Sequence, residues 1–220
     1  MLSLSYLLQR LISIPLILVA LVGHELGHGL VSTWLGDPTP KYNGRLTLNP
    51  MAHLDPIGAL LMFLTGFGWA KPVMINPNYY KNRKWGTALV SLAGPMSNLI
   101  MSVVVMFLYA LIVKVCIMLG VYNQTAIFWT QTIVIMFASY NLSLMLFNFI
   151  PIPPLDGSKI LGALLPDATY YKMLEYERYY TLILFGIIFL LSRMGVFSYF
   201  ISGGVSFFLN GIVNLLNMIF

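Results

Sequence analysis

The chain has 220 residues, of which 59% are hydrophobic and only 9% are charged. A soluble domain carries roughly 25% charged residues, so this composition excludes a water-soluble globular protein and indicates an integral membrane protein. The formal net charge of +5 does not indicate a nucleic-acid partner, because no basic stripe with interleaved aromatic residues lies on a polar face. The single Cys116 excludes an intramolecular disulfide and a CxxC metal site.

The first apolar run, Leu11–Leu35, is long enough to cross a bilayer core of about 30 Å. A polar, turn-rich region follows it. There Asn43-Gly44 separates two short runs, which predicts a β-hairpin over Lys41–Leu48. The next apolar run, Ile57–Ala70, is too short for a span, so we expect a re-entrant or interfacial segment.

Four further hydrophobic segments complete the chain: Gly86–Val113, Thr125–Phe149, Tyr179–Leu191 and Phe197–Ile219. No internal repeat, low-complexity tract or linker separates them. We therefore predict an all-α integral membrane protein with about five to six transmembrane helices and a small β-hairpin and re-entrant region after the first of them. The expected organisation is one membrane-embedded domain over residues 1–220, with a core over residues 11–165 and accessory C-terminal helices over residues 179–219.

The first apolar run contains the motif His24-Glu25-Leu26-Gly27-His28. On a helix, positions i and i+4 share one face, so both imidazoles can reach one metal ion. Zinc at such a site lowers the pKa of water towards 7, and Glu25 is placed to take the proton. The alternative is a chance polar cluster in a core helix. Ionisable groups inside a bilayer are costly and mark function, and two of the three His residues lie here, which favours the metal site.

A catalytic zinc ion needs a third protein ligand and one open position. Asp156 is the preferred candidate, because it follows an apolar helix and a Pro-rich break, and irregular backbone at membrane depth is tolerated where it lines a cavity. Capping of the next helix is the alternative role for Asp156. The other candidates are Asp37, His53, Asp55, Asp167, Glu175 and Glu177.

The membrane topology of the chain provides a test of Asp156 as the third ligand. If Ile57–Ala70 crosses the bilayer, Asp156 lies a full bilayer away from His28, whereas a segment that only dips into the membrane leaves them on one side. Charge favours the second arrangement, because nine of the 12 Lys and Arg residues then share one face, and the positive-inside rule makes that face cytoplasmic. These nine are Lys41, Arg45, Lys71, Lys81, Arg83, Lys84, Lys159, Lys172 and Arg178. The arrangement has five spans and places His28 about 10 Å below the cytoplasmic face.

Three motifs together resemble the site-2 protease family of intramembrane zinc metalloproteases, peptidase family M50. They are Gly23-His24-Glu25-Leu26-Gly27-His28-Gly29, Ser91-Leu92-Ala93-Gly94-Pro95-Met96-Ser97-Asn98, and Asn148-Phe149-Ile150-Pro151-Ile152-Pro153-Pro154-Leu155-Asp156-Gly157. The resemblance covers about residues 11–165 and is to a compact form without PDZ or CBS domains.

The resemblance implies one Zn²⁺ per chain, with His24, His28 and Asp156 as ligands and Glu25 as the catalytic base. It implies Asn148 as a substrate or oxyanion contact, with a helix-end cap as the equal alternative, and Asn141 as a similar case. Gly94 and Pro95 more naturally permit close helix packing or a kink than contact substrate. For His53 and Asp55, shaping of the entrance and stabilisation of a turn before Pro56 both stay open.

The expected function is hydrolysis of peptide bonds in or near transmembrane segments. Two measurements would test it: the zinc content of the chain and the loss of cleavage in the Glu25→Gln variant. The expected partners are a transmembrane protein substrate and the lipid bilayer, with no nucleic acid, and the oligomeric state stays open. The substrate helix would unwind and pair with the edge of Lys41–Leu48 or Lys71–Ile75. A membrane metal-binding or transport protein and a non-catalytic scaffold are the rivals. The expected location is the cell membrane, with the active site nearer the cytoplasmic face.

Overall fold

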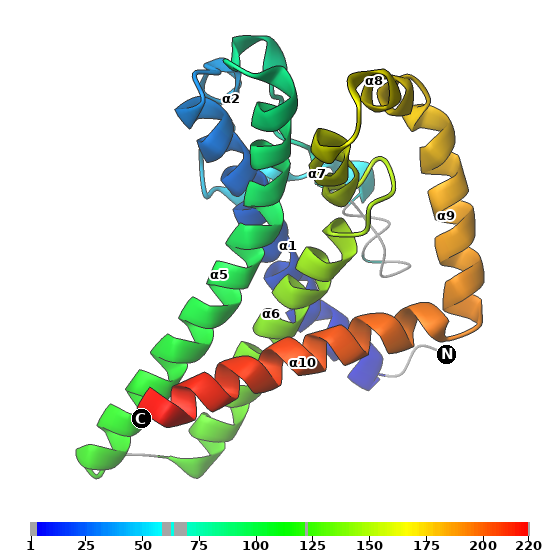
Figure 1. Cartoon of the computed structure of the whole chain (residues 1–220). Helices are drawn as coiled ribbons and strands as arrows, with labels where there is room; N and C mark the ends of the chain where they lie inside the picture. Colours follow the sequence, from blue (N-terminus) through cyan, green and yellow to red (C-terminus); the bar gives the residue numbers. More distant parts are fainter. Residues whose placement is uncertain (1–3, 59–62, 64–69, 122, 220) are drawn as a thin grey trace.

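The computed structural model describes residues 4–58, 63, 70–121 and 123–219, and the statements below refer to these residues. Nearly all regular structure in them is helical. The elements are α1 (Leu4–Trp34), α2 (Thr39–Tyr42), α3 (Pro50–His53), the 3-10 turn η1 (Pro77–Tyr79), α5 (Arg83–Met118), α6 (Gln124–Asn148), α7 (Asp156–Leu164), α8 (Asp167–Glu175), α9 (Glu177–Arg193) and α10 (Val196–Ile219). In Figure 1, α7 and α8 lie at the end of the molecule where α1 ends and α5 begins.

Four of these helices are long and apolar enough to cross a membrane: residues Arg10–Trp34 of α1, and all of α5, α6 and α10. The chain is therefore a helical membrane protein. The predicted number of five to six spans is not reached within the described part of the chain. The remaining helix that was predicted to span, α9, has 17 residues, which is at the lower end of the roughly 17–25 that a span needs, so a fifth span is not confirmed.

Polar side chains join the spanning helices to one another. The hydroxyls of Ser13 on α1 and Tyr140 on α6 lie 2.7 Å apart, and the Ser102 hydroxyl on α5 donates to the Ala138 carbonyl on α6 at 3.2 Å. In lipid the hydrophobic effect supplies little drive for helix association, so close packing and interhelical hydrogen bonds take its place. These contacts hold α1, α5 and α6 as one unit.

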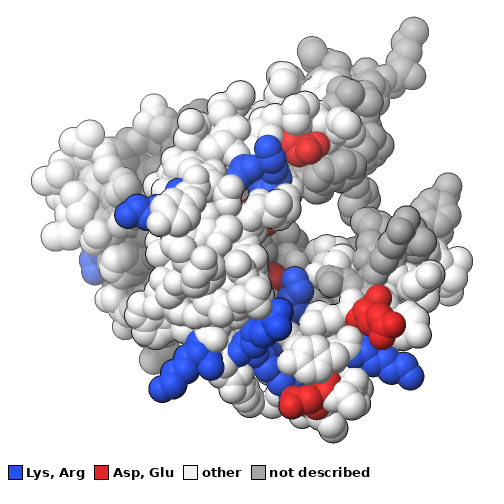
Figure 2. Space-filling view, turned by 90° about the horizontal axis from the view of Figure 1, so that it is seen from above, with Lys and Arg blue, Asp and Glu red and all other residues white. Residues whose placement is uncertain are grey.

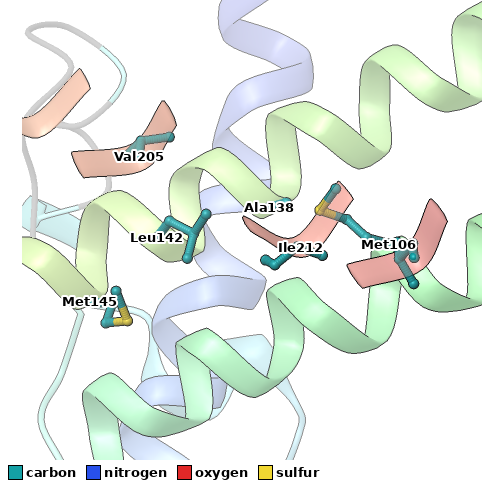
Figure 3. Close-up of a cluster of buried hydrophobic side chains, with 7 residues drawn as sticks. Met106, Ala138, Leu142, Met145, Val205 and Ile212 are labelled. Atoms are coloured by element: carbon teal, nitrogen blue, oxygen red, sulfur yellow. The ribbon is translucent and has the colours of Figure 1, made fainter. Parts of the chain in front are cut away.

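The hydrophobic core lies between α5, α6 and α10 (Figure 3). The buried side chains are Met106 from α5, Ala138, Leu142 and Met145 from α6, and Val205, Ile212 and Leu216 from α10. The last three recur at helical spacing, so α10 turns one apolar stripe towards α5 and α6. This core is separate from the polar residues of α1 and does not enclose the motif region.

The β-hairpin predicted over Lys41–Leu48 is wrong. Thr39–Tyr42 forms the short helix α2, and residues 43–48 contain no strand. The Asp37 carboxylate accepts from the Thr39 N–H at 2.9 Å, and Pro40, which has no N–H to satisfy, is well suited to a first helical turn. Backbone donors that a hairpin would use across strands are spent locally, as in Arg45 N–H to the Pro40 carbonyl at 3.0 Å.

Most of the predicted re-entrant segment, Ile57–Ala70, lies outside the described residues, but both of its ends are described. Leu54 and Ala70 form an antiparallel bridge, and the Lys71 N–H donates to the His53 carbonyl at 2.7 Å. The chain therefore leaves and returns at one place. This closure leaves α1 and the start of α5 at the same end of the bundle.

Candidate metal centre

Three side chains from distant parts of the chain converge at this end of the bundle. His24 and His28 lie one helical turn apart on α1, and Asp156 is the first residue of α7. The two Nε2 atoms are 3.0 Å apart, and Asp156 Oδ2 lies 3.2 Å from His24 Nε2 and 3.3 Å from His28 Nε2. Their ligand atoms all fall within 4.8 Å of one another.

A buried chain of amides fixes the tautomer of His24. Asn141 donates to the Phe137 carbonyl at 2.9 Å, which leaves its side-chain oxygen to accept from the Asn98 amide at 2.9 Å. Asn98 also donates to the Ala20 carbonyl at 3.0 Å, so its oxygen must be the atom that faces His24 Nδ1 at 2.7 Å. Nδ1 therefore carries a proton, and in the neutral imidazole, the form that binds a metal ion, Nε2 presents a lone pair.

His28 is oriented in the same way by the backbone. Its Nδ1 lies 2.7 Å from the Val90 carbonyl oxygen, which can only accept a hydrogen bond. Nδ1 is therefore the protonated nitrogen of His28 as well. Both imidazoles present unprotonated Nε2 atoms to the same point.

This donor set fits a divalent metal ion. In the neutral imidazoles that bind a metal ion, two Nε2 lone pairs and a carboxylate oxygen face one another at 3.0–3.3 Å. Tetrahedral ligands with bonds of about 2.0–2.2 Å lie about 3.3 Å apart, and two His plus one carboxylate is a known catalytic zinc set. An ion at the centre would replace a repulsive contact with three bonds.

Two glycines permit this convergence. A Cβ on Gly94 of α5 would collide with the His28 imidazole and lie 2.7 Å from His24 Cε1, so α5 can pass the two rings only with glycine there. The predicted packing role of Gly94 is thus confirmed. A Cβ on Gly157 would collide with the Phe149 carbonyl, so the chain can fold back from α6 into α7 only with glycine at that position.

Glu25 is held beside the three ligand side chains by the segment that precedes η1. Its Oε2 accepts from the Val73 N–H at 2.8 Å, which leaves Oε1 available. Residues 71–76 are tied down on either side of Val73, because the Lys71 N–H donates to the His53 carbonyl and the Asn76 N–H donates to Asp37 at 2.7 Å. The position of the Glu25 carboxylate is therefore set by α1 and by this segment together.

The residues surround a cavity of about 260 Å³. It is lined by His24, Glu25 and His28 from α1, Pro72, Val73 and Ile75 from the segment 71–76, Val90 and Ser91 from α5, Asn148 from α6, and Pro154, Asp156 and Lys159 around the start of α7. Figure 2 looks onto this end of the molecule, where basic side chains gather around a hollow and acidic side chains are visible inside it.

The structure brings most of the predicted site residues to this cavity. Asn148 lines it, with its amide donating to the Leu144 carbonyl at 3.0 Å and its side-chain oxygen accepting no hydrogen bond from the described part of the chain. Asn141 does not line it and is fully buried, two hydrogen bonds away from His24. Asn98 was present in a predicted motif without a role, and only the fold reveals its contact with His24.

Four of the alternative third ligands have other contacts in the described part of the chain. Asp37 accepts from Ser32 at 2.7 Å and from Thr39 and Asn76, and Asp167 pairs with Lys84 at 2.9 Å. Asp55 accepts from the Gly58 N–H at 2.8 Å, so the predicted turn at Asp55 is confirmed. His53 is buried and lies 3.0 Å from the Thr47 carbonyl oxygen.

Comparison with known proteins gives a consistent result. The model of "Peptidase family M50" matches residues 112–193. "Putative zinc metalloprotease YwhC" of Bacillus subtilis is 40% identical over 168 residues, which is 74% of this chain and 73% of that protein. "Putative zinc metalloprotease Rip2" of Mycolicibacterium smegmatis is 30% identical over 158 residues, and Rip2 of Mycobacterium tuberculosis is 29% identical over 145 residues. These matches cover 68% and 64% of this chain but only 54% and 52% of the two Rip2 proteins. No solved structure matches the chain.

Proposed function

The chain belongs to peptidase family M50 and is a metalloprotease whose cofactor is zinc, and we propose that it hydrolyses peptide bonds within or beside the bilayer in membrane-protein substrates. The observation that carries the proposal is the convergence of His24, His28 and Asp156 next to Glu25 on a helix long and apolar enough to span a membrane. Intramembrane proteolysis requires both parts of this arrangement, a hydrolytic centre and its location on a spanning helix.

We assign His24, His28 and Asp156 as the zinc ligands. Asn98 and the Val90 carbonyl hold the two imidazoles in the tautomer that metal binding requires. When bound, zinc supplies Lewis-acid chemistry, polarising a carbonyl and making water a nucleophile near neutral pH. The cavity beside the three assigned ligands would give substrate and water room next to a bound ion.

Glu25 acts as the general base and then as the general acid. One carboxylate oxygen accepts from the Val73 N–H at 2.8 Å, so the carboxylate is fixed in direction. The other oxygen takes a proton from the attacking water and returns it to the leaving amine. Asn148 lies at the cavity wall, and its side-chain oxygen, which has no donor among the described residues, accepts a hydrogen bond from a backbone N–H of the substrate.

The segment 71–76 is the substrate-pairing edge in this proposal. Lys71, Val73 and Asn76 use their N–H groups within the chain, whereas the Met74 N–H finds no partner among the residues that the structure describes, and Met74 is exposed. An amide in a helix is shielded by its own hydrogen bonds, so a substrate helix must unwind before it is cleaved. An unwound strand regains hydrogen bonds by pairing with this edge. The predicted alternative edge over Lys41–Leu48 is not used, because no strand forms there.

The orientation in the membrane follows from charge. The end of the bundle that carries the site also carries Lys41, Lys71, Lys81 and Arg83, all of them exposed. Basic residues accumulate on the cytoplasmic side of membrane proteins. We therefore assign the site to the cytoplasmic half of the cell membrane.

Glu25→Gln tests the reaction. The purified chain and the variant are placed in phospholipid vesicles with a pool of synthetic transmembrane peptides, and cleavage is read by mass spectrometry. Both proteins are expected to hold one zinc ion, while Glu25→Gln lowers the cleavage rate by about 10²-fold or more. Glu175→Gln, at an exposed position on α8 outside the cavity, is the matched control.

A metal-binding or transport protein and a non-catalytic scaffold are the rival functions. Either would retain zinc in both proteins and cleave no peptide in the pool. Cleavage by Glu25→Gln at the unmodified rate would also refute the assigned role of Glu25. Removal of zinc with a chelator must stop cleavage, and returning one equivalent must restore it.

A further inference from the structure

One charged side chain at the cavity has no part in the mechanism above. Lys159 lies on α7, one helical turn after Asp156, is half-buried and lines the cavity together with Glu25 and the three assigned ligands. The ion pairs found within the described residues do not include it, and no hydrogen bond to its ammonium group is found there. Lys159 is thus a cation at the reaction site without a partner in this part of the chain.

The acidic groups of the cavity are already engaged. The Asp156 carboxylate faces His24 and His28, and Glu25 accepts from the Val73 N–H. By contrast, Lys84, at the start of α5, contacts the Leu165 carbonyl at the C-terminal end of α7 and the Asp167 carboxylate. The difference indicates that Lys159 is left free to meet a group that enters the cavity.

The net charge of the cavity with a divalent ion bound indicates which kind of group Lys159 would attract. The carboxylates of Glu25 and Asp156 together balance one divalent ion, so Lys159 leaves the cavity with an excess positive charge. In a partly water-excluded site this charge is screened less than on an open surface, so it attracts an anionic group and repels a cationic one. A substrate strand beside the edge 71–76 enters this same cavity, which Lys159 lines from α7.

We propose that Lys159 is a specificity-determining residue that binds an Asp or Glu side chain close to the scissile bond of the substrate. This inference rests on the proposed function and names its substrate class: membrane segments with a carboxylate beside the cleaved bond. The recognition is a charge-assisted hydrogen bond from the ammonium group to the substrate carboxylate. Segments with Lys or Arg at that place are disfavoured by repulsion.

Charge reversal tests the proposal without relying on cleavage. The probes are synthetic transmembrane peptides that carry Glu, Gln or Lys at successive positions in the half facing the site. Binding to the Glu25→Gln protein is measured in neutral phosphatidylcholine vesicles and again with added phosphatidylglycerol. We expect Glu peptides to bind about tenfold more tightly than Lys peptides at one or two positions. In the Lys159→Glu variant, Lys peptides should bind more tightly than Glu peptides. In the Lys159→Gln variant, the two kinds of peptide should bind with similar affinity.

Lys172→Glu is the matched control, because it makes the same charge change at an exposed position on α8 outside the cavity. It must keep the preference for Glu peptides. Zinc content is measured in every variant, and Lys159→Arg must retain the preference. A Lys159→Gln protein that still prefers Glu peptides would overturn the proposal, as would a preference that exists only with phosphatidylglycerol, since Lys159 would then bind a lipid phosphate.

Cleavage by proteins with an intact Glu25 separates this inference from the function beneath it. If peptides are cleaved but the preference does not invert in Lys159→Glu, the specificity proposal fails and the protease stands. If binding inverts but no peptide is cleaved, the protease proposal fails and the carboxylate site stands. If Lys159→Gln instead lowered the cleavage rate by the same factor for Glu, Gln and Lys peptides, Lys159 would act on the carbonyl group of the cleaved bond. That result would overturn its role in specificity.

Discussion

His24 and His28 are each positioned through the ring nitrogen that points away from the site. Asn98 accepts from one Nδ1 and the Val90 carbonyl from the other, so both Nε2 atoms are free for metal. The sequence predicts the pair of histidines from their spacing, since i and i+4 share a helix face. It does not predict the contact of Asn98 with His24, which depends on how α5 packs against α1.

Replacement of Asn98 is expected to weaken zinc binding. Asn98→Leu keeps the approximate volume but removes the acceptor for His24 Nδ1, so the imidazole loses both its tautomer and its orientation. Loss of such a partner typically lowers metal affinity 10–100-fold. Competition with a fluorescent zinc chelator measures the effect. Asn141→Leu, one hydrogen bond further away, should lower the affinity less, and an equal or larger loss there would contradict the order of the amide chain.

Gly94→Ala is expected to disrupt the metal centre. The added methyl group would occupy the space of the two imidazole rings, and overpacking of this kind costs typically 1–3 kcal/mol. Zinc content and peptide cleavage should both fall, while circular dichroism still reports a helical protein.

Gly203→Ala on α10 is the matched control for Gly94→Ala, because nothing lies within 4 Å of its added Cβ. Its zinc content should equal that of the unmodified chain. If Gly94→Ala behaved like Gly203→Ala, α5 could not pass the histidines as closely as described.

At the scale of elements, the apolar runs predicted helices well and the turns poorly. The runs Gly86–Val113 and Thr125–Phe149 correspond to α5 and α6, whose ends are set by Asn82 and Asn123 accepting from Trp85 and Ala126 N–H groups. Length and hydropathy suffice for such spans. The hairpin prediction was wrong because it used only the Asn43-Gly44 turn signal. It did not take account of Asp37, whose buried carboxylate accepts from the Thr39 N–H at the start of α2.

Asp37 also joins elements that position the site. It accepts from Ser32 near the end of α1, from the Thr39 N–H at the start of α2 and from the Asn76 N–H beside η1. Tyr80 lies 2.8 Å from the Ser32 hydroxyl and extends the same network. One carboxylate therefore anchors the segment 71–76 that holds Glu25.

Burial acts to raise the pKa of Asp37, but the hydrogen bonds from Thr39, Asn76 and Ser32 outweigh it and hold the pKa below its usual value. A lowered pKa in the folded state stabilises the fold above the ordinary Asp pKa of about 3.9, and this contribution is lost as pH falls through the lowered value. At pH 7, Asp37→Asn should cost about 1–3 kcal/mol, because three donors lose a charged acceptor.

Thermal unfolding in detergent measures this effect at pH 7, 5 and 3.5. The gap between the unmodified chain and Asp37→Asn should be constant at the two higher values and shrink at the lowest. A gap that stayed the same at pH 3.5 would mean that the charge of Asp37 contributes nothing to folding.

At the scale of the whole molecule, the meeting of α1 with α7 depends on how the chain between α3 and η1 is routed. The distribution of Lys and Arg residues favoured the route in which Asp156 reaches the histidines. In the structure Asp156 Oδ2 lies 3.2 Å from His24 Nε2 and 3.3 Å from His28 Nε2. Nothing local to residues 57–70 could decide this, since a short apolar run fits either route. The direction of insertion into the membrane stays a prediction from charge.

Cysteine labelling tests that direction. In a Cys116→Ser background, Tyr79→Cys and Lys172→Cys place exposed thiols at the end of the molecule that carries the site, and Leu119→Cys places one at the far end of α5. In intact cells a membrane-impermeant maleimide should label Leu119→Cys only. In inverted vesicles it should label the other two. The reverse pattern would put the site at the outer face.

The paired ends at Leu54 and Ala70 carry a consequence for how this architecture varies. The Lys71 N–H and the His53 carbonyl close the chain upon itself beside the Leu54–Ala70 bridge, and the Arg10 guanidinium on α1 donates to the Phe63 carbonyl within the stretch between them at 3.3 Å. Changes of length within this stretch that keep the Leu54–Ala70 bridge are therefore expected to leave α3 and the segment 71–76 in place. We expect relatives of this chain to vary more in this stretch than in α1 and α7, which carry the three side chains of the metal centre.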